Sequence, residues 1–258
     1  MRTLYLDCST GVSGDMLLAA LTHAADGLIQ GEKTRDFLEK RLKSLGIEGF
    51  QLEWVDKRVG GIQTLHVDVV QTLDQPLRTF SDLSNIVASS DIPNDAANRA
   101  LSALRLLGEA EAKVHGVDLE SVHFHEIGAV DTVVDIVGAM LLTDCLDVSR
   151  VVVSPIDLGS GFVRCAHGKM PVPAPACAEL SRSLVTFGSD CGMERATPTG
   201  LAVARTLADS CGPLPMGRVL AVGYGSGGRS SDEQPTYVRA FVLESVAEEL
   251  PDRESDRA

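Results

Sequence analysis

The chain has 258 residues, of which 44% are apolar and 23% charged, and it carries a formal net charge of −13 with a pI near 4.8. This length suffices for one large or two modest domains, and the apolar content excludes a chain that is disordered throughout. The negative charge argues against nonspecific binding to nucleic acid or anionic membranes, because both need a basic surface.

The cysteine pattern and the N-terminus give an expectation of location. None of the six cysteines forms a CxxC pair, so the sequence signal of a zinc ribbon is absent. The N-terminus runs directly into TLYLDC without the basic, apolar and small-residue order of a signal peptide. The longest apolar run, residues 133–142, is too short to span a bilayer and contains Asp135. We therefore expect a reduced, cytoplasmic protein with free thiols.

The first third of the chain reads as alternating strands and helices. The expected strands are residues 3–7, 50–59 and 64–70, and the expected helices are residues 16–25 and 34–46. The second helix carries its leucines on one face and has Gly46 as a stop signal. Gly60 and Gly61 separate the later two strands, which predicts a hairpin.

The remainder continues the alternation. We expect helices over residues 93–116, 129–145 and 197–212, strands over 151–159 and 236–244, an ordered loop or extended piece over 167–176, and a Gly/Ser-rich loop over 221–231. Strands with helical crossovers predict an α/β protein with a mixed sheet, and a mixed α+β architecture is the alternative. Residues 1–245 would form the main region, with a small α+β subdomain at about 32–90, and 246–258 a charged tail.

The stretch HFHEIGAVDTVVDIVGAM at 123–140 is the strongest candidate for a metal site. Its candidate ligands are His123, His125, Glu126, Asp131 and Asp135. The two histidines project to one face of a strand, and the two aspartates stack one turn apart on a helix. Mixed nitrogen and oxygen ligands suit zinc, nickel, manganese or iron. Alternatively, Asp131 only complements the helix N-terminus, whereas a buried Asp135 would still need a partner.

Three turns rich in small residues are candidate binding sites for an anionic ligand. GVSGDM contributes Gly11, Ser13, Gly14 and Asp15, TPTG contributes Thr197 and Thr199, and GYGSGG contributes Gly225. Free backbone N–H groups at such turns and helix N-termini attract phosphate. Plain turns and a helix cap are the alternatives. His23, His66 and His115 stand alone in the sequence and are given no role.

Taken together, these segments resemble the LarC family of nickel insertion proteins. The resemblance is carried by LYLDCSTGVSGDM, GGIQTLHVDV, VHFHEIGAVDTVVDIVGA, SPIDLGSGFVRCAHGKMPVPAPA, ATPTGLAV and GYGSGGR, in this order. It implies insertion of nickel into pyridinium-3,5-bisthiocarboxylic acid mononucleotide, with carbon–nickel and sulfur–nickel bonds formed and CTP consumed as co-substrate. The implied enzyme is a CTP-dependent nickel cyclometallase of the lyase class.

The resemblance also assigns roles. Ni(2+) would be held by the candidate ligands above, Mn(2+) or Mg(2+) would be a further cation, and Glu126 or His167 would do general acid/base work. Full-length members continue into a region associated with CTP and metal binding, so a separate C-terminal LarC-like partner chain is implied. A homo-oligomer is a further possible assembly. Where members often carry a histidine-rich stretch, this chain reads PLRTFSDL.

Two other interpretations remain open at this stage. In the first, the chain is a non-catalytic nickel carrier or scaffold that needs a partner for turnover. In the second, it is a related enzyme that acts with a metal on another nucleotide. Turnover by the chain alone would exclude the carrier, whereas metal analysis would address the second alternative.

Overall fold

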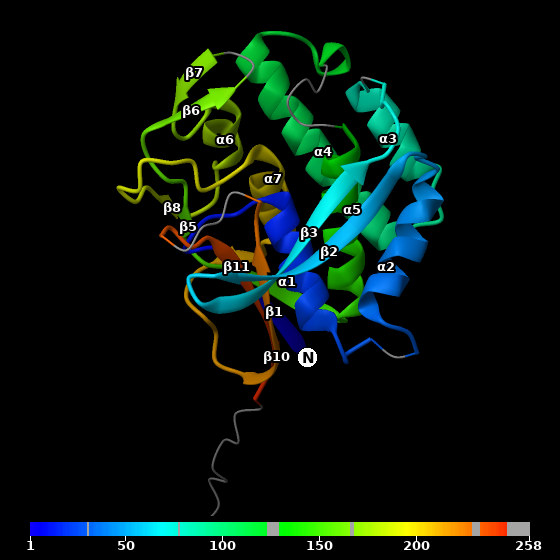
Figure 1. Cartoon of the computed structure of the whole chain (residues 1–258), viewed down its shortest axis with the longest axis vertical. Helices are drawn as coiled ribbons and strands as arrows, with labels where there is room; N and C mark the ends of the chain where they lie inside the picture. The colour runs from blue at the N-terminus through cyan, green and yellow to red at the C-terminus, as the bar shows by residue number, and fades with distance from the viewer. Residues whose placement is uncertain (30, 77, 123–128, 166–167, 229–232, 247–258) are drawn as a thin grey trace, which may run out of the picture.

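The computed structural model describes residues 1–29, 31–76, 78–122, 129–165, 168–228 and 233–246 (Figure 1). The α-helices are α1 (Gly14–Ala25), α2 (Thr34–Leu42), α3 (Phe80–Ala88), α4 (Asn94–His115), α5 (Ala129–Cys145), α6 (Pro175–Leu180) and α7 (Pro198–Leu207). The strands are β1 (Arg2–Asp7), β2 (Phe50–Val59), β3 (Ile62–Gln71), β4 (Val148–Val153), β5 (Ile156–Asp157), β6 (Phe162–Cys165), β7 (Gly168–Pro171), β8 (Thr186–Phe187), β9 (Ser210–Cys211), β10 (Arg218–Ser226) and β11 (Tyr237–Glu244).

A mixed seven-stranded sheet forms the scaffold, in the order β2-β3-β10-β11-β1-β4-β9. β1 is central, because it pairs antiparallel with β11 on one side and parallel with β4 on the other. β3 and β10 pair in parallel at a single position, Leu65 opposite Gly225, so the β2–β3 hairpin crosses the rest of the sheet at that point. This crossing brings the hairpin next to the end of β10.

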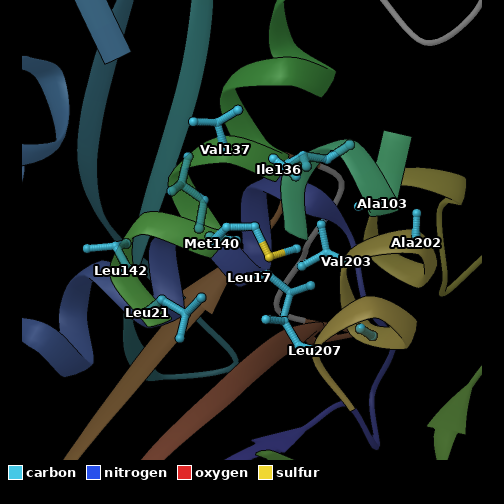
Figure 2. Close-up of a cluster of buried hydrophobic side chains, with 14 of the residues drawn as sticks. Leu17, Leu21, Ala103, Ile136, Val137, Met140, Leu142, Ala202, Val203 and Leu207 are labelled. Carbon is cyan, nitrogen blue, oxygen red and sulfur yellow. The ribbon is translucent and has the colours of Figure 1, made fainter. Parts of the chain in front are cut away.

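The main core lies between this sheet and the helices. α1 packs on β10, β3 and β11, and α5 packs on α1 and α4. Figure 2 shows leucines of α1, Met140 of α5 and Val203 of α7 pointing toward one another, and all of these side chains are buried. A small separate cluster contains Tyr5, Val152 and Leu243. Burial of aliphatic side chains at about 1.5–3 kcal/mol each makes this core the main source of stability.

Several predictions from the sequence are confirmed. The structure is α/β with a mixed sheet, the helix at 129–145 has the expected bounds, and the long helix α4 ends before Gly116, whose φ of 66° closes it. The second helix ends in a short 3-10 turn at Lys43–Leu45, followed by left-handed Gly46. The predicted hairpin pairs Val59 with Ile62 across Gly60 and Gly61. The six cysteines are free.

Other predictions were wrong in ways that packing explains. Residues 221–226 belong to strand β10 and not to a loop. The expected strand 151–159 is divided at Pro155, which has no N–H for a ladder, and β5 then pairs with β8 in a separate small sheet. The helix expected to reach residue 212 stops at Leu207, because Asp209 bonds to the backbone of Val151 and β9 follows.

Two helices were not predicted. α3 begins at a capping box in which Thr79 accepts from the Asp82 N–H and the Asp82 carboxylate accepts from the Thr79 N–H. α6 begins at Pro175 inside the proline-rich segment, where proline suits a first turn. Within the described residues, no helix has both the length and the apolar character needed to cross a membrane.

Candidate functional site

A cavity of about 280 Å³ lies where three sequence-distant turns meet. Its lining residues come from the start of α1, the segment before α7, the turn after β10 and the position before β11. They are Ser13, Asp15, Met16, Met193, Glu194, Arg195, Thr197, Gly227, Gly228 and Thr236. The structure thus brings together the three turns that the sequence predicted as anion sites, and Ser13, Asp15 and Thr197 among the predicted residues line the cavity directly.

Backbone pairing joins the two helix starts at this cavity. The Val12 N–H donates to the Arg195 carbonyl at 2.8 Å, and the Thr197 N–H donates to the Val12 carbonyl at 2.9 Å. Thr197 caps α7 by accepting from the Gly200 N–H. α1 and α7 lie side by side (Figure 1), and any side chain at Gly200 would collide with the Ser13 backbone. The starts of two helices, with Ser13 and Asp15 at α1 and Thr197 at α7, therefore line one space, toward which their dipoles offer partial positive charge.

Asp15 is one of two carboxylates in the cavity lining, with Glu194, and its side chain is well bonded. One oxygen accepts from the Ser13 hydroxyl and from the Met16 N–H at 2.9 Å. The other accepts from the Gly228 N–H at 3.3 Å and lies 4.0 Å from Nδ1 of His66. These bonds fix the Asp15 side chain between α1 and the glycine-rich turn, so it shapes the cavity and offers a negative charge there.

Arg195 is the cation among the described lining residues. Its terminal nitrogen donates to the Pro235 carbonyl at 3.4 Å, while its Nε is buried and has no partner within the described part of the chain. An arginine with unused donor capacity beside two helix N-termini favours a phosphate or carboxylate ligand. The Arg195 charge also acts on the thiol pKa of Cys191 nearby. Burial opposes ionisation of Cys191, but bonds from Ser189, Arg195 and the Met193 backbone lower its thiol pKa to about 7.

The predicted glycines and Thr199 lie behind the cavity wall. Gly11, with a φ of 113°, touches the Arg195 backbone, and Gly225 touches the backbone of α1, so a Cβ at either would collide. Gly14 is equally close to the Asp135 side chain, and Thr199 is buried in α7. These residues let the helices approach each other. Their contact with a ligand stays a prediction.

The two aspartates of α5 lie near Asp15. Asp135 is buried, its Oδ1 has no hydrogen-bond partner among the described residues, and burial, with Asp15 and Asp131 nearby, raises its pKa well above the usual value. Asp131 is exposed overall, but enclosure of its carboxylate and the charge of Asp15 raise its pKa, against a bond from the Thr132 N–H. Asp135 therefore needs a proton or a cation as partner.

The rest of the predicted metal site cannot be placed. His123, His125, Glu126 and His167 lie outside the described residues. Within the described ranges, no group of at least three histidine, cysteine or acidic side chains has the geometry of a metal site. The five-residue ligand set and the acid/base roles of Glu126 and His167 stay predictions.

Sequence reasoning missed Arg195 and Met193 as cavity residues. The only local signal was their position just before the TPTG helix start, since their placement depends on pairing with Val12 far away in the sequence. It also missed a second cavity of about 440 Å³ between α1, α2, the β2–β3 hairpin and β10, lined by His23, Arg35 and Tyr224 among others.

Fold and cavity together define an α/β protein with a polar cavity built on two helix N-termini and an arginine. The family model described as "Nickel insertion protein" matches residues 4–257. The chain belongs to the nickel insertion protein family, as the resemblance implied. No solved structure matches it significantly.

The names of similar proteins agree with this family assignment. A putative nickel insertion protein of Geotalea uraniireducens is 41% identical over 98% of this chain and 63% of its own length. The pyridinium-3,5-bisthiocarboxylic acid mononucleotide nickel insertion proteins of Geobacillus kaustophilus and Akkermansia muciniphila are 36% and 40% identical, over 95% and 96% of this chain and 61% and 62% of their own lengths. The chain thus spans under two thirds of the length of these relatives.

Proposed function

We propose that this chain acts in the insertion of nickel into pyridinium-3,5-bisthiocarboxylic acid mononucleotide, the substrate named for two of its relatives. The observation that carries the proposal is the convergence of GVSGDM, TPTG and GYGSGG on one cavity. A mononucleotide has a phosphate, and the cavity offers the donors that a phosphate needs. The reaction would be that of a nickel cyclometallase, of the lyase class, in the cytoplasm.

In this proposal the phosphate lies between the starts of α1 and α7. The N–H groups of these two helix ends and the Arg195 guanidinium would donate to its oxygens. Asp15 and Glu194, which line the same cavity, would repel a second anionic group and so orient the thiocarboxylates away from the phosphate end. The Thr197 hydroxyl accepts from the Gly200 N–H and would contribute its own hydrogen as a donor, whereas the Ser13 hydroxyl donates to Asp15.

Nickel is a substrate of this reaction. The proposed ligands before its transfer are His123, His125, Glu126, Asp131 and Asp135. Of the two that the structure describes, Asp131 and Asp135, Asp135 has a buried oxygen without a partner among the described residues. When a carbon–nickel bond replaces a ring C–H bond, a proton is released and a base must accept it. Glu126 or His167 is the proposed base, and the two thiocarboxylate sulfurs supply further soft donors to nickel(II). CTP, with Mg(2+) or Mn(2+), is the proposed co-substrate.

A second candidate function is that of a nickel carrier or scaffold. It is an alternative because more than a third of each relative named for this insertion lies outside the matched region, so the match alone does not carry over their whole activity. In that case the cavity holds the mononucleotide, while turnover requires a C-terminal partner chain or a second copy of this chain.

The test is an incubation of the purified chain with nickel(II), CTP and the thiolated mononucleotide, followed by mass spectrometry for a nickel adduct that has lost the ring proton. The Arg195→Ala variant should bind the mononucleotide at least tenfold more weakly, the loss of about 1.4 kcal/mol or more that a charged bond supplies. Arg150→Ala, an exposed arginine on β4, is the matched control. Binding without product supports the carrier; no binding at all contradicts both functions.

A further inference from the structure

His66 of β3 is buried, and each of its ring nitrogens lies beside an oxygen atom. It is 3% exposed, Nδ1 lies 2.7 Å from the Ser226 carbonyl, and Nε2 lies 3.1 Å from an Asp68 carboxylate oxygen. A carbonyl oxygen can only accept, so Nδ1 carries the hydrogen of the bond to Ser226. The nearest oxygen of Asp15 is 4.0 Å from Nδ1.

This histidine lies at the one point where the β2–β3 hairpin meets β10. The bonded carbonyl belongs to Ser226, the last residue of β10, and the chain then forms the cavity wall with Gly227 and Gly228. Neither glycine has a side chain that could hold the turn in place. The position of the wall therefore depends on bonds made to its backbone by neighbouring elements.

The hairpin makes two more contacts with this turn. The buried Thr64 hydroxyl donates to the Ser226 hydroxyl at 2.7 Å, and the Lys57 carbonyl is a second, longer acceptor for it at 3.2 Å. Lys57 donates to the Gly227 carbonyl at 3.3 Å. From the opposite side, Asp15 accepts from the Gly228 N–H.

We propose that His66 is a positioning residue of the cavity: it fixes the Ser226–Gly228 turn and the Asp15 carboxylate in the arrangement that binds the mononucleotide. The inference rests on the proposed function for the identity of the ligand, while the positioning itself is a property of the free protein. His66 touches no cavity space and is not a catalytic residue.

The experiment measures two quantities on wild type, His66→Ala and His66→Gln. The first is backbone amide exchange of peptides covering residues 224–228, and the second is affinity for nicotinic acid mononucleotide, a pyridinium mononucleotide, by calorimetry. In His66→Ala, exchange at Gly228 should be about tenfold faster through local opening, and affinity should fall about tenfold. Glutamine retains one N–H for the Ser226 carbonyl and should recover part of both losses.

His23→Ala is the matched control, because His23 also bonds to β10, at the Tyr224 N–H, but lies in the second cavity. It should leave the exchange of residues 226–228 and the affinity unchanged. Thr64→Val, which keeps His66, should shift them in the same direction by a smaller factor. Unchanged exchange in a folded His66→Ala protein overturns the inference, as does unchanged affinity where wild type binds. If exchange is faster in His66→Ala but the wild type binds no mononucleotide, the positioning role is supported and the proposed function is overturned.

Discussion

Two aspartates lie on opposite sides of the first turn of α1, and their surroundings differ completely. Asp15 faces the cavity and accepts hydrogen bonds from Ser13, Met16 and Gly228. Asp135 faces the core, is 8% exposed, and has an oxygen without a partner among the described residues. The start of α1 therefore has two different environments. On the cavity side it holds the Asp15 carboxylate as a hydrogen-bonded anion. On the side of Gly14 it leaves room for Asp135, which favours a proton or a cation as partner.

The largest expected effect comes from filling the space at Gly14. In Gly14→Ala the new Cβ would lie less than 3.0 Å from the Asp135 carboxylate, in a fully packed region. Overpacking at such a position costs about 3 kcal/mol of the free energy of unfolding. Urea denaturation measures it. Gly212→Ala, where no atom lies within 4 Å, is the control and should change stability by less than about 0.5 kcal/mol.

A double mutant sharpens this test. If the collision is with Asp135, then Gly14→Ala combined with Asp135→Ala should cost clearly less than the sum of the two single changes, because the removed carboxylate vacates the space. Simple additivity would show that a Cβ at position 14 does not collide with the Asp135 carboxylate.

The next effect concerns the charge of Asp135. Its pKa is raised in the native state, so the native protein binds a proton that the unfolded chain releases above about pH 4. The free energy of unfolding should therefore fall as pH rises above that value. Asp135→Asn, which cannot ionise, should equal wild type near pH 4 and exceed it by about 1 kcal/mol or more at pH 8.

Denaturation of both proteins at the two pH values, in the presence of a chelator, checks this prediction. Parallel pH profiles would contradict the raised pKa. Repeating the measurement with nickel(II) sharpens the comparison, because a cation that pairs with Asp135 should stabilise wild type and not the asparagine variant.

The smallest expected effect concerns the thiol of Cys191, which lies beside Arg195 on the cavity side of the α1 start. Because the Cys191 pKa is about 7, alkylation by iodoacetamide should reach half its maximal rate near pH 7. Arg195→Ala should move this midpoint toward the value of an ordinary thiol, by about one pH unit. Peptide mass spectrometry follows the labelling, with the distant, exposed Arg218→Ala as control. An unchanged midpoint would show that the Arg195 charge does not affect the Cys191 thiol.

Much of the fold could be predicted because its signals are local. Gly46 and Gly116 end helices, and the Gly60–Gly61 pair turns a hairpin, each through a conformation that glycine adopts easily. Strand β10 was missed because Gly223 and Gly225 indicated a loop. Both are glycine because α1 lies so close that a Cβ would strike its backbone, which only the tertiary structure reveals.

The candidate site was predictable in its parts and not in its assembly. Ser13, Asp15 and Thr197 carried local helix-start signals, and they do line one cavity. Arg195 reaches that cavity through pairing of its neighbour Ala196 with Val12, and His66 gains its role through Ser226, which is 160 positions away in the chain. No periodicity or spacing within a single segment contains such contacts.

The proposed function requires that the mononucleotide binds where the starts of α1 and α7 meet. A crystal structure of the chain with the thiolated pyridinium mononucleotide is the most direct test. We expect the phosphate within hydrogen-bonding distance of the Arg195 guanidinium and of backbone N–H groups at both helix starts. A phosphate bound instead in the second cavity, beside His23 and Arg35, would contradict it.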